Sequence, residues 1–90
     1  MAWRIEFSVG ADKTLGKLDV QIGRRIRKFL DRVASQENPR SIGDALQGSK
    51  LGELWRYRVG DYRLICSLED DQLIVLVLRI GHRREVYKRA

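Results

Sequence analysis

The 90-residue sequence has one cysteine, one proline and one histidine. A single cysteine cannot form a disulfide within the chain, so a reducing compartment such as the cytoplasm fits this composition. Cys66 and His82 are the only thiol and imidazole groups, which argues against a zinc site built by this protein alone. We therefore expect neither a metal nor another cofactor.

The sequence also lacks an apolar run long enough to cross a bilayer, and Met1 opens no signal-peptide pattern. Positive charge is in excess: 18 lysines and arginines stand against 12 acidic residues, which gives a net charge of +6. This charge predicts an acidic partner, either nucleic acid or an acidic protein, whereas an anionic membrane surface would rest on charge alone. A chain of 90 residues with 43% hydrophobic content predicts one small domain, residues 1–90.

The most informative stretch, residues 54–67, reads LWRYRVGDYRLICS. Two runs rich in β-branched and aromatic residues flank Gly60-Asp61, which fits a two-residue hairpin turn because glycine accepts a positive φ. With that turn Val59 faces Tyr62, and the pairing continues outward residue by residue. One side of the hairpin then carries the core residues Trp55, Tyr57, Val59, Tyr62, Leu64 and Cys66. The other side carries Arg56, Arg58 and Arg63.

Three guanidinium groups on adjoining sheet positions repel one another, by up to about 1 kcal/mol for each close pair. An anionic partner would relieve this repulsion. A solvated basic strand face is the simpler interpretation, and the pattern by itself leaves both open.

Apolar–polar alternation predicts a half-buried strand over residues 3–9 that ends at Gly10. Its inward side chains would be Trp3, Ile5, Phe7 and Val9. Asp12 is the expected N-cap of a short helix over residues 13–18, and Asp19 that of a longer helix ending near Ser35. The longer helix has one apolar stripe, made of Ile22, Ile26, Phe29, Leu30 and Val33.

Residues 36–52 are polar and are interpreted as a connecting loop, with one turn of helix near residues 42–46. Leu46 and Leu51 are expected to anchor this loop to the core. A turn at residues 69–72 then leads to an apolar strand over residues 73–80. If Leu68 pairs with Leu73, Val75 and Val77 join the core face. The arginine side receives Ile74, Leu76 and Leu78, and a side that mixes apolar and basic residues suggests a covering partner.

In order, spacing and length these elements resemble the RelE/ParE toxin superfamily over almost the whole chain. The local matches are Leu46-Gln47-Gly48, Trp55-Arg56-Tyr57-Arg58, Gly60-Asp61-Tyr62-Arg63-Leu64-Ile65 and Gly81-His82-Arg83-Arg84-Glu85-Val86-Tyr87. The last of these is similar to the ending of the RelE branch, whose members cut mRNA in the ribosomal A site. The resemblance implies an α+β fold in which an N-terminal strand and two helices precede a three-stranded antiparallel meander.

In the RelE branch the ribose 2′-hydroxyl attacks the adjacent phosphorus, assisted by basic residues and a C-terminal tyrosine. Carried over by position, the resemblance implies the catalytic residues Arg56, Arg58, Arg63, Arg83 and Tyr87. Arg63 and Arg83 suit the charge on phosphorus, because arginine binds phosphate oxygens bidentately and stays charged. Arg56 and Arg58 stand where the best-known members have lysines, and arginine is a poor proton carrier. Tyr87 would stack on an unpaired base or take part in proton transfer.

The resemblance implies three kinds of partner: a RelB-like antitoxin, the ribosome with its mRNA, and operator DNA bound through the antitoxin. Two other functions stay open, a ParE-like inhibitor of DNA gyrase without chemistry of its own and a non-toxic module that only binds an antitoxin. His82 titrates nearest to neutrality, but we interpret it as a turn residue, and Cys66 as a core residue.

Overall fold

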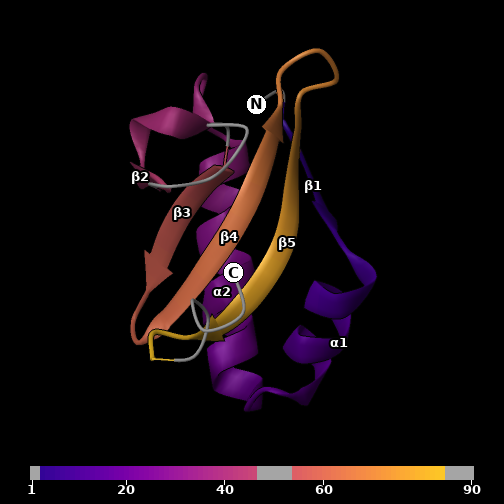
Figure 1. Cartoon of the computed structure of the whole chain (residues 1–90), viewed down its shortest axis with the longest axis vertical. Helices are drawn as coiled ribbons and strands as arrows, with labels where there is room; N and C mark the ends of the chain where they lie inside the picture. The colour runs from indigo at the N-terminus through magenta and orange to yellow at the C-terminus, as the bar shows by residue number, and fades with distance from the viewer. Residues whose placement is uncertain (1–2, 47–53, 85–90) are drawn as a thin grey trace.

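The computed structural model describes residues 3–46 and 54–84. Its elements, in chain order, are β1 (Arg4–Phe7), α1 (Val9–Lys17), α2 (Val20–Ala34), the 3-10 helix η1 (Pro39–Ser41), β2 (Asp44–Ala45), β3 (Leu54–Val59), β4 (Tyr62–Glu69) and β5 (Ile74–His82). They form a five-stranded sheet in the order β1-β5-β4-β3-β2, in which only β1 and β5 are parallel neighbours. In Figure 1 the sheet lies in front and α2 crosses behind it. The predicted α+β fold is confirmed.

The core lies between the helices and one side of the sheet. Helix α2 begins after Asp19, whose carboxylate accepts a hydrogen bond from the Gln21 amide at 2.8 Å, as the sequence predicts. The buried helix side chains are Ala11, Leu15, Ile26, Leu30 and Val33. The sheet contributes Tyr57, Leu64, Cys66, Val75 and Val77, each fully buried. Burial raises the pKa of the Cys66 thiol, so this cysteine is protonated and serves as a packing residue.

The central hairpin has the predicted register. Val59 pairs with Tyr62, Arg58 with Arg63 and Arg56 with Ile65, on either side of a turn at Gly60-Asp61. Gly60 has φ +60°, which this turn requires. The predicted separation of core residues from Arg56, Arg58 and Arg63 follows from this register.

The first strand is shorter than the alternation predicts. Ser8 ends it and caps α1, because its hydroxyl accepts a hydrogen bond from the Ala11 amide at 3.0 Å. The helix therefore starts at Val9 rather than after Asp12, and Gly10 lies inside it. Val9 is 74% exposed, so its predicted place in the core is wrong.

The segment between α2 and β3 contains a strand instead of the predicted turn of helix. The Asn38 side chain accepts a hydrogen bond from the Arg40 amide and starts η1, with Pro39 at its first position. Gly43, at φ +85°, then turns the chain onto the edge of β3, where β2 pairs with Trp55 and Arg56. Leu46 is half-buried, and the predicted anchor Leu51 lies outside the described residues.

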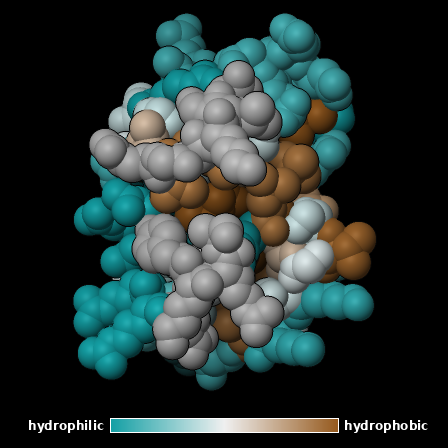
Figure 2. Space-filling model, viewed as in Figure 1, coloured by the Kyte–Doolittle hydropathy of each residue, from teal (hydrophilic) through white to brown (hydrophobic). Residues whose placement is uncertain are grey.

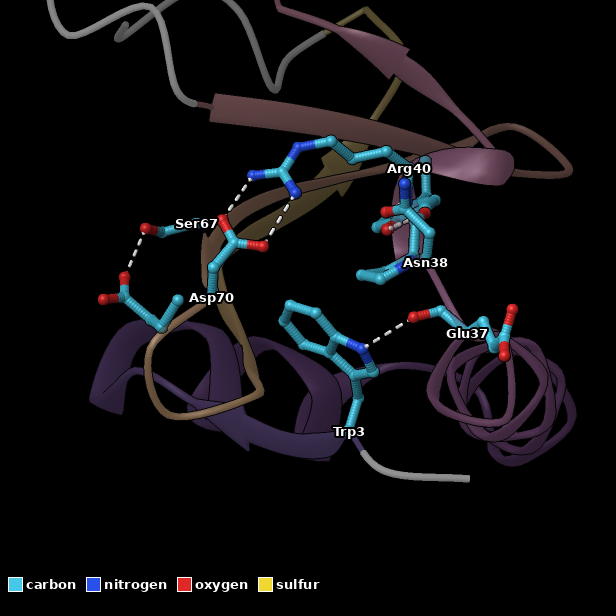
Figure 3. Close-up of polar contacts among 9 residues, drawn as sticks. Trp3, Glu37, Asn38, Arg40, Ser67 and Asp70 are labelled. Atoms are coloured by element: carbon cyan, nitrogen blue, oxygen red, sulfur yellow. Dashed lines mark hydrogen bonds and ion pairs between the residues drawn. The ribbon is translucent and has the colours of Figure 1, made fainter.

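Aromatic side chains and the Arg40–Asp70 ion pair help to attach this connecting segment to the sheet. The ring N–H of Trp3 donates to the Glu37 carbonyl at 3.2 Å, and that of Trp55 to the Ile42 carbonyl at 2.7 Å. The Tyr57 hydroxyl donates to the Pro39 carbonyl at 2.8 Å. Figure 3 shows Arg40 reaching across to Asp70, with two hydrogen bonds of 3.0 and 2.9 Å. The Arg40 guanidinium holds the pKa of the Asp70 carboxyl below its usual value.

The last strand has a different register from the predicted one. Leu73 has φ +56° and belongs to the turn, so Leu68 pairs with Val75 and not with Leu73. The predicted sides of Ile74, Leu76, Val75 and Val77 are nevertheless correct, because a shift of two residues preserves the side. Farther along, a bulge interrupts the β4–β5 pairing: Cys66 pairs with Val77, but Ile65 pairs with Arg79, which leaves Leu78 as the extra residue.

No helix in the part of the chain that the structure describes is both long and apolar enough to span a membrane.

Gly43 provides a test of this architecture. A Cβ at this position would lie 2.5 Å from the Arg56 carbonyl oxygen and would strain a residue at positive φ. We expect Gly43→Ala to lower the free energy of unfolding by about 1–3 kcal/mol, measured by urea denaturation. The control is Gly16→Ala in α1, where a Cβ has no neighbour within 4 Å and should stabilise the helix by about 0.5–1 kcal/mol. Equal stability of the two variants would contradict the geometry of β2.

Candidate nucleic-acid interface on the sheet

Five strand arginines lie on the side of the sheet that faces away from the helices, and we call this side the arginine face; Arg4 is at its far end, and the other four gather on β3, β4 and β5. Arg56 and Arg58 come from β3, Arg63 from β4 and Arg79 from β5. Arg58 is directly opposite Arg63, while Arg56 and Arg79 flank Ile65 in one row across three strands. Because neighbouring strands are about 4.8 Å apart, all four guanidinium groups come within reach of one segment of a polyanion. The sequence-predicted cluster of Arg56, Arg58 and Arg63 therefore forms.

Arg79 is the member of this face that the sequence analysis missed. Alternation from Val75 and Val77 would place Arg79 in the core and Ile80 on the outer side. The bulge at Leu78 reverses this order, so that Arg79 pairs with Ile65 and Ile80 is 5% exposed in the core. The signal was present, because a charged residue in a core position next to an isoleucine predicts a break in the alternation.

Arg56 is held by an acidic side chain from the neighbouring strand. Its Nη2 lies 3.3 Å from Oδ2 of Asp44, the residue opposite it in β2. The Arg56 side chain is 23% exposed, compared with 55% for Asp44. Asp44 therefore offsets part of the positive charge at this edge and fixes the direction of the Arg56 guanidinium.

Arg63 and the backbone of Arg83 are both hydrogen-bonded to the hairpin turn at Gly60-Asp61. Nη1 of Arg63 donates to the carbonyl oxygens of Gly60 and Tyr62, both at 3.0 Å. The backbone amide of Arg83 donates to the Asp61 carbonyl at 2.7 Å, which fastens the end of β5 to the same turn. Arg83 is exposed. Two residues before it, Gly81 is opposite Arg63 and contributes no side chain. The backbone of Arg83 therefore lies beside the hairpin turn that Arg63 contacts, and its membership of the site stays a prediction, whereas Tyr87 lies outside the described residues.

Apolar residues occupy the other part of the same face. Ile74 and Leu76 lie on it, and Ile65 is only 6% exposed between the two arginines of its row. In Figure 2, which views this face, hydrophobic residues gather in the middle and toward the right, and hydrophilic residues lie along the left side. The predicted mixture of apolar and basic surface on one sheet side is therefore present.

His82 lies on the opposite side of the sheet from the arginines. It pairs with Tyr62, and the two rings meet edge to face with centroids 5.8 Å apart. Its Nδ1 accepts a hydrogen bond from the Arg84 amide at 3.3 Å. The interpretation of His82 as a turn residue is wrong, because His82 is the last residue of β5 and pairs with Tyr62, and the turn begins after it.

The described part of the arginine face can bind phosphate but has few groups that move protons. Its basic side chains are all arginines, which stay charged and present several donors to an oxyanion. Across residues 3–46 and 54–84, no three His, Cys, Asp or Glu side chains gather in a way that would hold a metal ion. The arrangement is suited to holding an RNA backbone and to stabilising added negative charge on one of its phosphates.

Comparisons with known proteins agree with this geometry. The family described as "ParE toxin of type II toxin-antitoxin system, parDE" matches residues 5–87. Toxin RelG of Mycobacterium tuberculosis is 30% identical over 99% of this chain and 100% of its own length. The mRNA interferase toxin RelE of Escherichia coli is 30% identical over 100% of this chain and 95% of that protein. The toxin-antitoxin complex RelBE2 from Mycobacterium tuberculosis contains a chain with TM-score 0.79 and 29% identity, matched over 92% of this chain and 100% of that one.

Because Arg58 and Arg63 are directly opposite each other, we expect their repulsion to destabilise the protein when no anion is bound. We expect Arg58→Gln to raise the free energy of unfolding by about 0.2–0.5 kcal/mol at low salt, because it removes one of two facing cations. At about 1 M salt the difference should vanish, since the Debye length falls to about 3 Å. Arg27→Gln is the control, because Arg27 is equally exposed on α2 and has Asp31 one helical turn away. A loss of stability in Arg58→Gln at low salt, measured by urea denaturation, would contradict the expected repulsion.

Proposed function

Because this chain belongs to the RelE/ParE family of type II toxins, we propose that it is a ribosome-dependent endoribonuclease that cleaves mRNA in the A site and so inhibits translation. The arginine face carries this proposal, since it places Arg56, Arg58, Arg63 and Arg79 on one side of the sheet. The relative named an mRNA interferase toxin matches the chain over its whole length, which supports the same reaction.

The proposed reaction is an internal transfer at one phosphate. The ribose 2′-oxygen forms a bond to the adjacent phosphorus, and the bond between that phosphorus and the 5′-oxygen of the next nucleotide breaks. The products are a 2′,3′-cyclic phosphate and a free 5′-hydroxyl group. The 2′-hydroxyl gives up one proton and the leaving 5′-oxygen receives one, so the reaction needs a base, an acid and no redox partner.

The arginines stabilise the phosphorus centre and its neighbours in this proposal. Arg63, whose side chain contacts the hairpin turn, and Arg83, whose backbone is bonded to it, would bind the oxygens of the scissile phosphate, where charge increases in the transition state. Arg58, directly opposite Arg63, and Arg56, in the next row on this side of β3, hold the flanking backbone. Arg79, across Ile65 from Arg56, adds a contact from the opposite edge of the face.

Proton transfer is assigned to other groups, because the guanidinium pKa above about 12 keeps arginine protonated at neutral pH. Tyr87 is the candidate within the chain, as the resemblance to RelE-like toxins implies. Groups of the ribosome are the second source, which accounts for cleavage of mRNA only when it occupies the A site.

A RelB-like antitoxin is the proposed protein partner. The relative of known structure with TM-score 0.79 was solved as a toxin–antitoxin complex. An acidic or apolar segment laid over the arginine face would contact the cations and the apolar residues Leu76 and Ile65 together. Such a cover would inhibit cleavage by occupying the RNA site.

Alanine substitution of the two arginines at the turn tests the reaction. We expect Arg63→Ala and Arg83→Ala each to lower the rate of mRNA cleavage by about 10²–10³-fold, because each removes an electrostatic contact to the scissile phosphate. The measurement is primer extension on a reporter mRNA after induction, with rates from purified ribosomes carrying the same mRNA. Arg4→Ala is the matched control, since Arg4 pairs with Ile74 on the same sheet side at its far end and is bound to Glu6.

Three results would contradict the proposal in different ways. Growth arrest with intact mRNA and damaged DNA would indicate a gyrase inhibitor instead. Harmless expression of the unsubstituted chain would indicate a module that only binds an antitoxin. Equal loss of cleavage in Arg4→Ala would show that the effect depends on overall charge and not on the positions of Arg63 and Arg83.

Arg79 has its own expected effect. We expect Arg79→Ala to lower the cleavage rate by about 10-fold, the effect of losing about 1.4 kcal/mol from one hydrogen bond to a charged group. Arg79→Lys keeps the charge without the bidentate fork and should recover part of the rate. Rates of both variants, measured on programmed ribosomes, test this role. A rate for Arg79→Ala equal to that of the unsubstituted chain would remove Arg79 from the site.

A further inference from the structure

A second basic surface lies around the edge of β3 from the arginine face. It is a groove of about 470 Å³ between α2 and the end of β3, and we call it the helix groove. It is lined by Arg25, Lys28, Phe29, Arg32, Arg58, Val59 and Gly60. The four helix residues are spaced i, i+3, i+4 and i+7, so they share one side of α2.

The charged residues that line the helix groove are all positive. Arg25, Lys28, Arg32 and Arg58 are exposed, and none of the seven lining residues is acidic. Two acidic residues, Asp31 beside Arg32 and Asp61 beside Gly60, adjoin the lining residues in the sequence, but neither lines the groove. Four exposed cations around one hollow create a potential that attracts a polyanion more strongly than scattered surface charges do.

The helix groove is continuous with the arginine face. Arg58 belongs to both, because it stands on the arginine face of β3 and also lines the groove. The Gly60 turn lies between cations from the two sides: Nη1 of Arg63 bonds to the Gly60 carbonyl, and a Cβ on Gly60 would be 3.0 Å from Nη1 of Arg25. An anionic chain can therefore pass from one surface to the other without leaving positive charge.

The groove also has an aromatic element. Phe29 is half-buried, its ring meets the Tyr57 ring edge to face at 5.7 Å, and the Arg32 guanidinium carbon lies 5.4 Å from its centroid. The guanidinium lies over the ring, which supports it, and unpaired bases stack on arginine guanidinium planes as well as on aromatic rings. This feature favours single-stranded nucleic acid over an acidic peptide, which needs only the charges.

We propose that the helix groove binds the backbone of a single-stranded RNA segment that continues from the cleavage site on the arginine face. This inference rests on the proposed function for the identity of the polyanion. The groove adds affinity and direction to the RNA, while the chemistry stays on the arginine face.

Two double variants of α2 test the proposal at equal net charge. Arg25→Gln with Lys28→Gln removes two cations from the groove, and Arg24→Gln with Arg27→Gln removes two exposed cations with the same spacing from another side of the helix. The probe is a fluorescein-labelled, 2′-O-methylated RNA of about 12 nucleotides, which cannot be cleaved. Binding is measured by fluorescence anisotropy over a range of salt concentrations.

We expect the groove variant to bind the RNA about 10-fold more weakly than the control variant. Its slope of log K against log salt should fall by about 1.4, as for two lost phosphate contacts to single-stranded RNA. Equal affinities of the two variants would overturn the proposal. So would normal RNA affinity together with weaker binding of a poly-glutamate peptide, which would assign the groove to an acidic protein.

Cleavage on programmed ribosomes separates this inference from the proposed function. The groove variant should need more protein for half-maximal cleavage and reach an unchanged maximal rate. If the unsubstituted chain shows no cleavage while the two variants differ in RNA binding, the proposed function is wrong and the RNA-binding role of the groove is supported. If cleavage occurs and the two variants behave alike in both assays, the RNA-binding role of the groove is wrong and the proposed function is supported.

Discussion

The pairing of β3 with β4 is the constraint on which the rest of the structure depends. It places Tyr57, Leu64 and Cys66 in a fully buried core and, on the alternate positions, Arg56, Arg58 and Arg63 on the outer side. A slip of one residue would exchange the two sets. Each large apolar side chain would then lose about 1.5–3 kcal/mol of burial, and each buried guanidinium would cost several kcal/mol. The hydrophobic core thus fixes the position of the cations, although no core residue takes part in the proposed reaction.

The predictions from sequence succeed where the determining interactions are local. Gly60 sets the hairpin within two residues, and Asp19 caps α2 through the amide of Gln21, two positions ahead. The predictions fail where the local structure depends on residues that are distant in the sequence. Gly43 turns the chain into β2 because the Arg56 carbonyl and the rings of Trp55 and Tyr57 leave no room for a side chain, and nothing in residues 36–46 alone carries this information.

The end of β1 and the bulge in β5 are one structural event, although 70 residues separate them. The Ser8 hydroxyl accepts from the Ala11 amide to start α1 and donates to the Leu78 carbonyl at 2.9 Å, while the Ser8 amide donates to Val77. Leu78 is the bulged residue, and its carbonyl would otherwise lack a partner in the ladder. The same serine therefore sends Val9 out of the core and supports the bulge that turns Arg79 outward. Neither result follows from alternation within either strand.

The composition of the arginine face explains why the proposed enzyme would depend on the ribosome. Its described cations are arginines, which stabilise a phosphorane-like charge at any physiological pH but exchange no proton there. His82, the one imidazole of the chain, lies on the other side of the sheet against Tyr62. A surface of this kind binds RNA of many sequences and cleaves slowly unless a base and an acid are supplied from elsewhere. Under the proposed function, dependence on the A site would limit the damage by a free toxin to mRNA under translation, and an antitoxin that covers one face of the sheet would stop it.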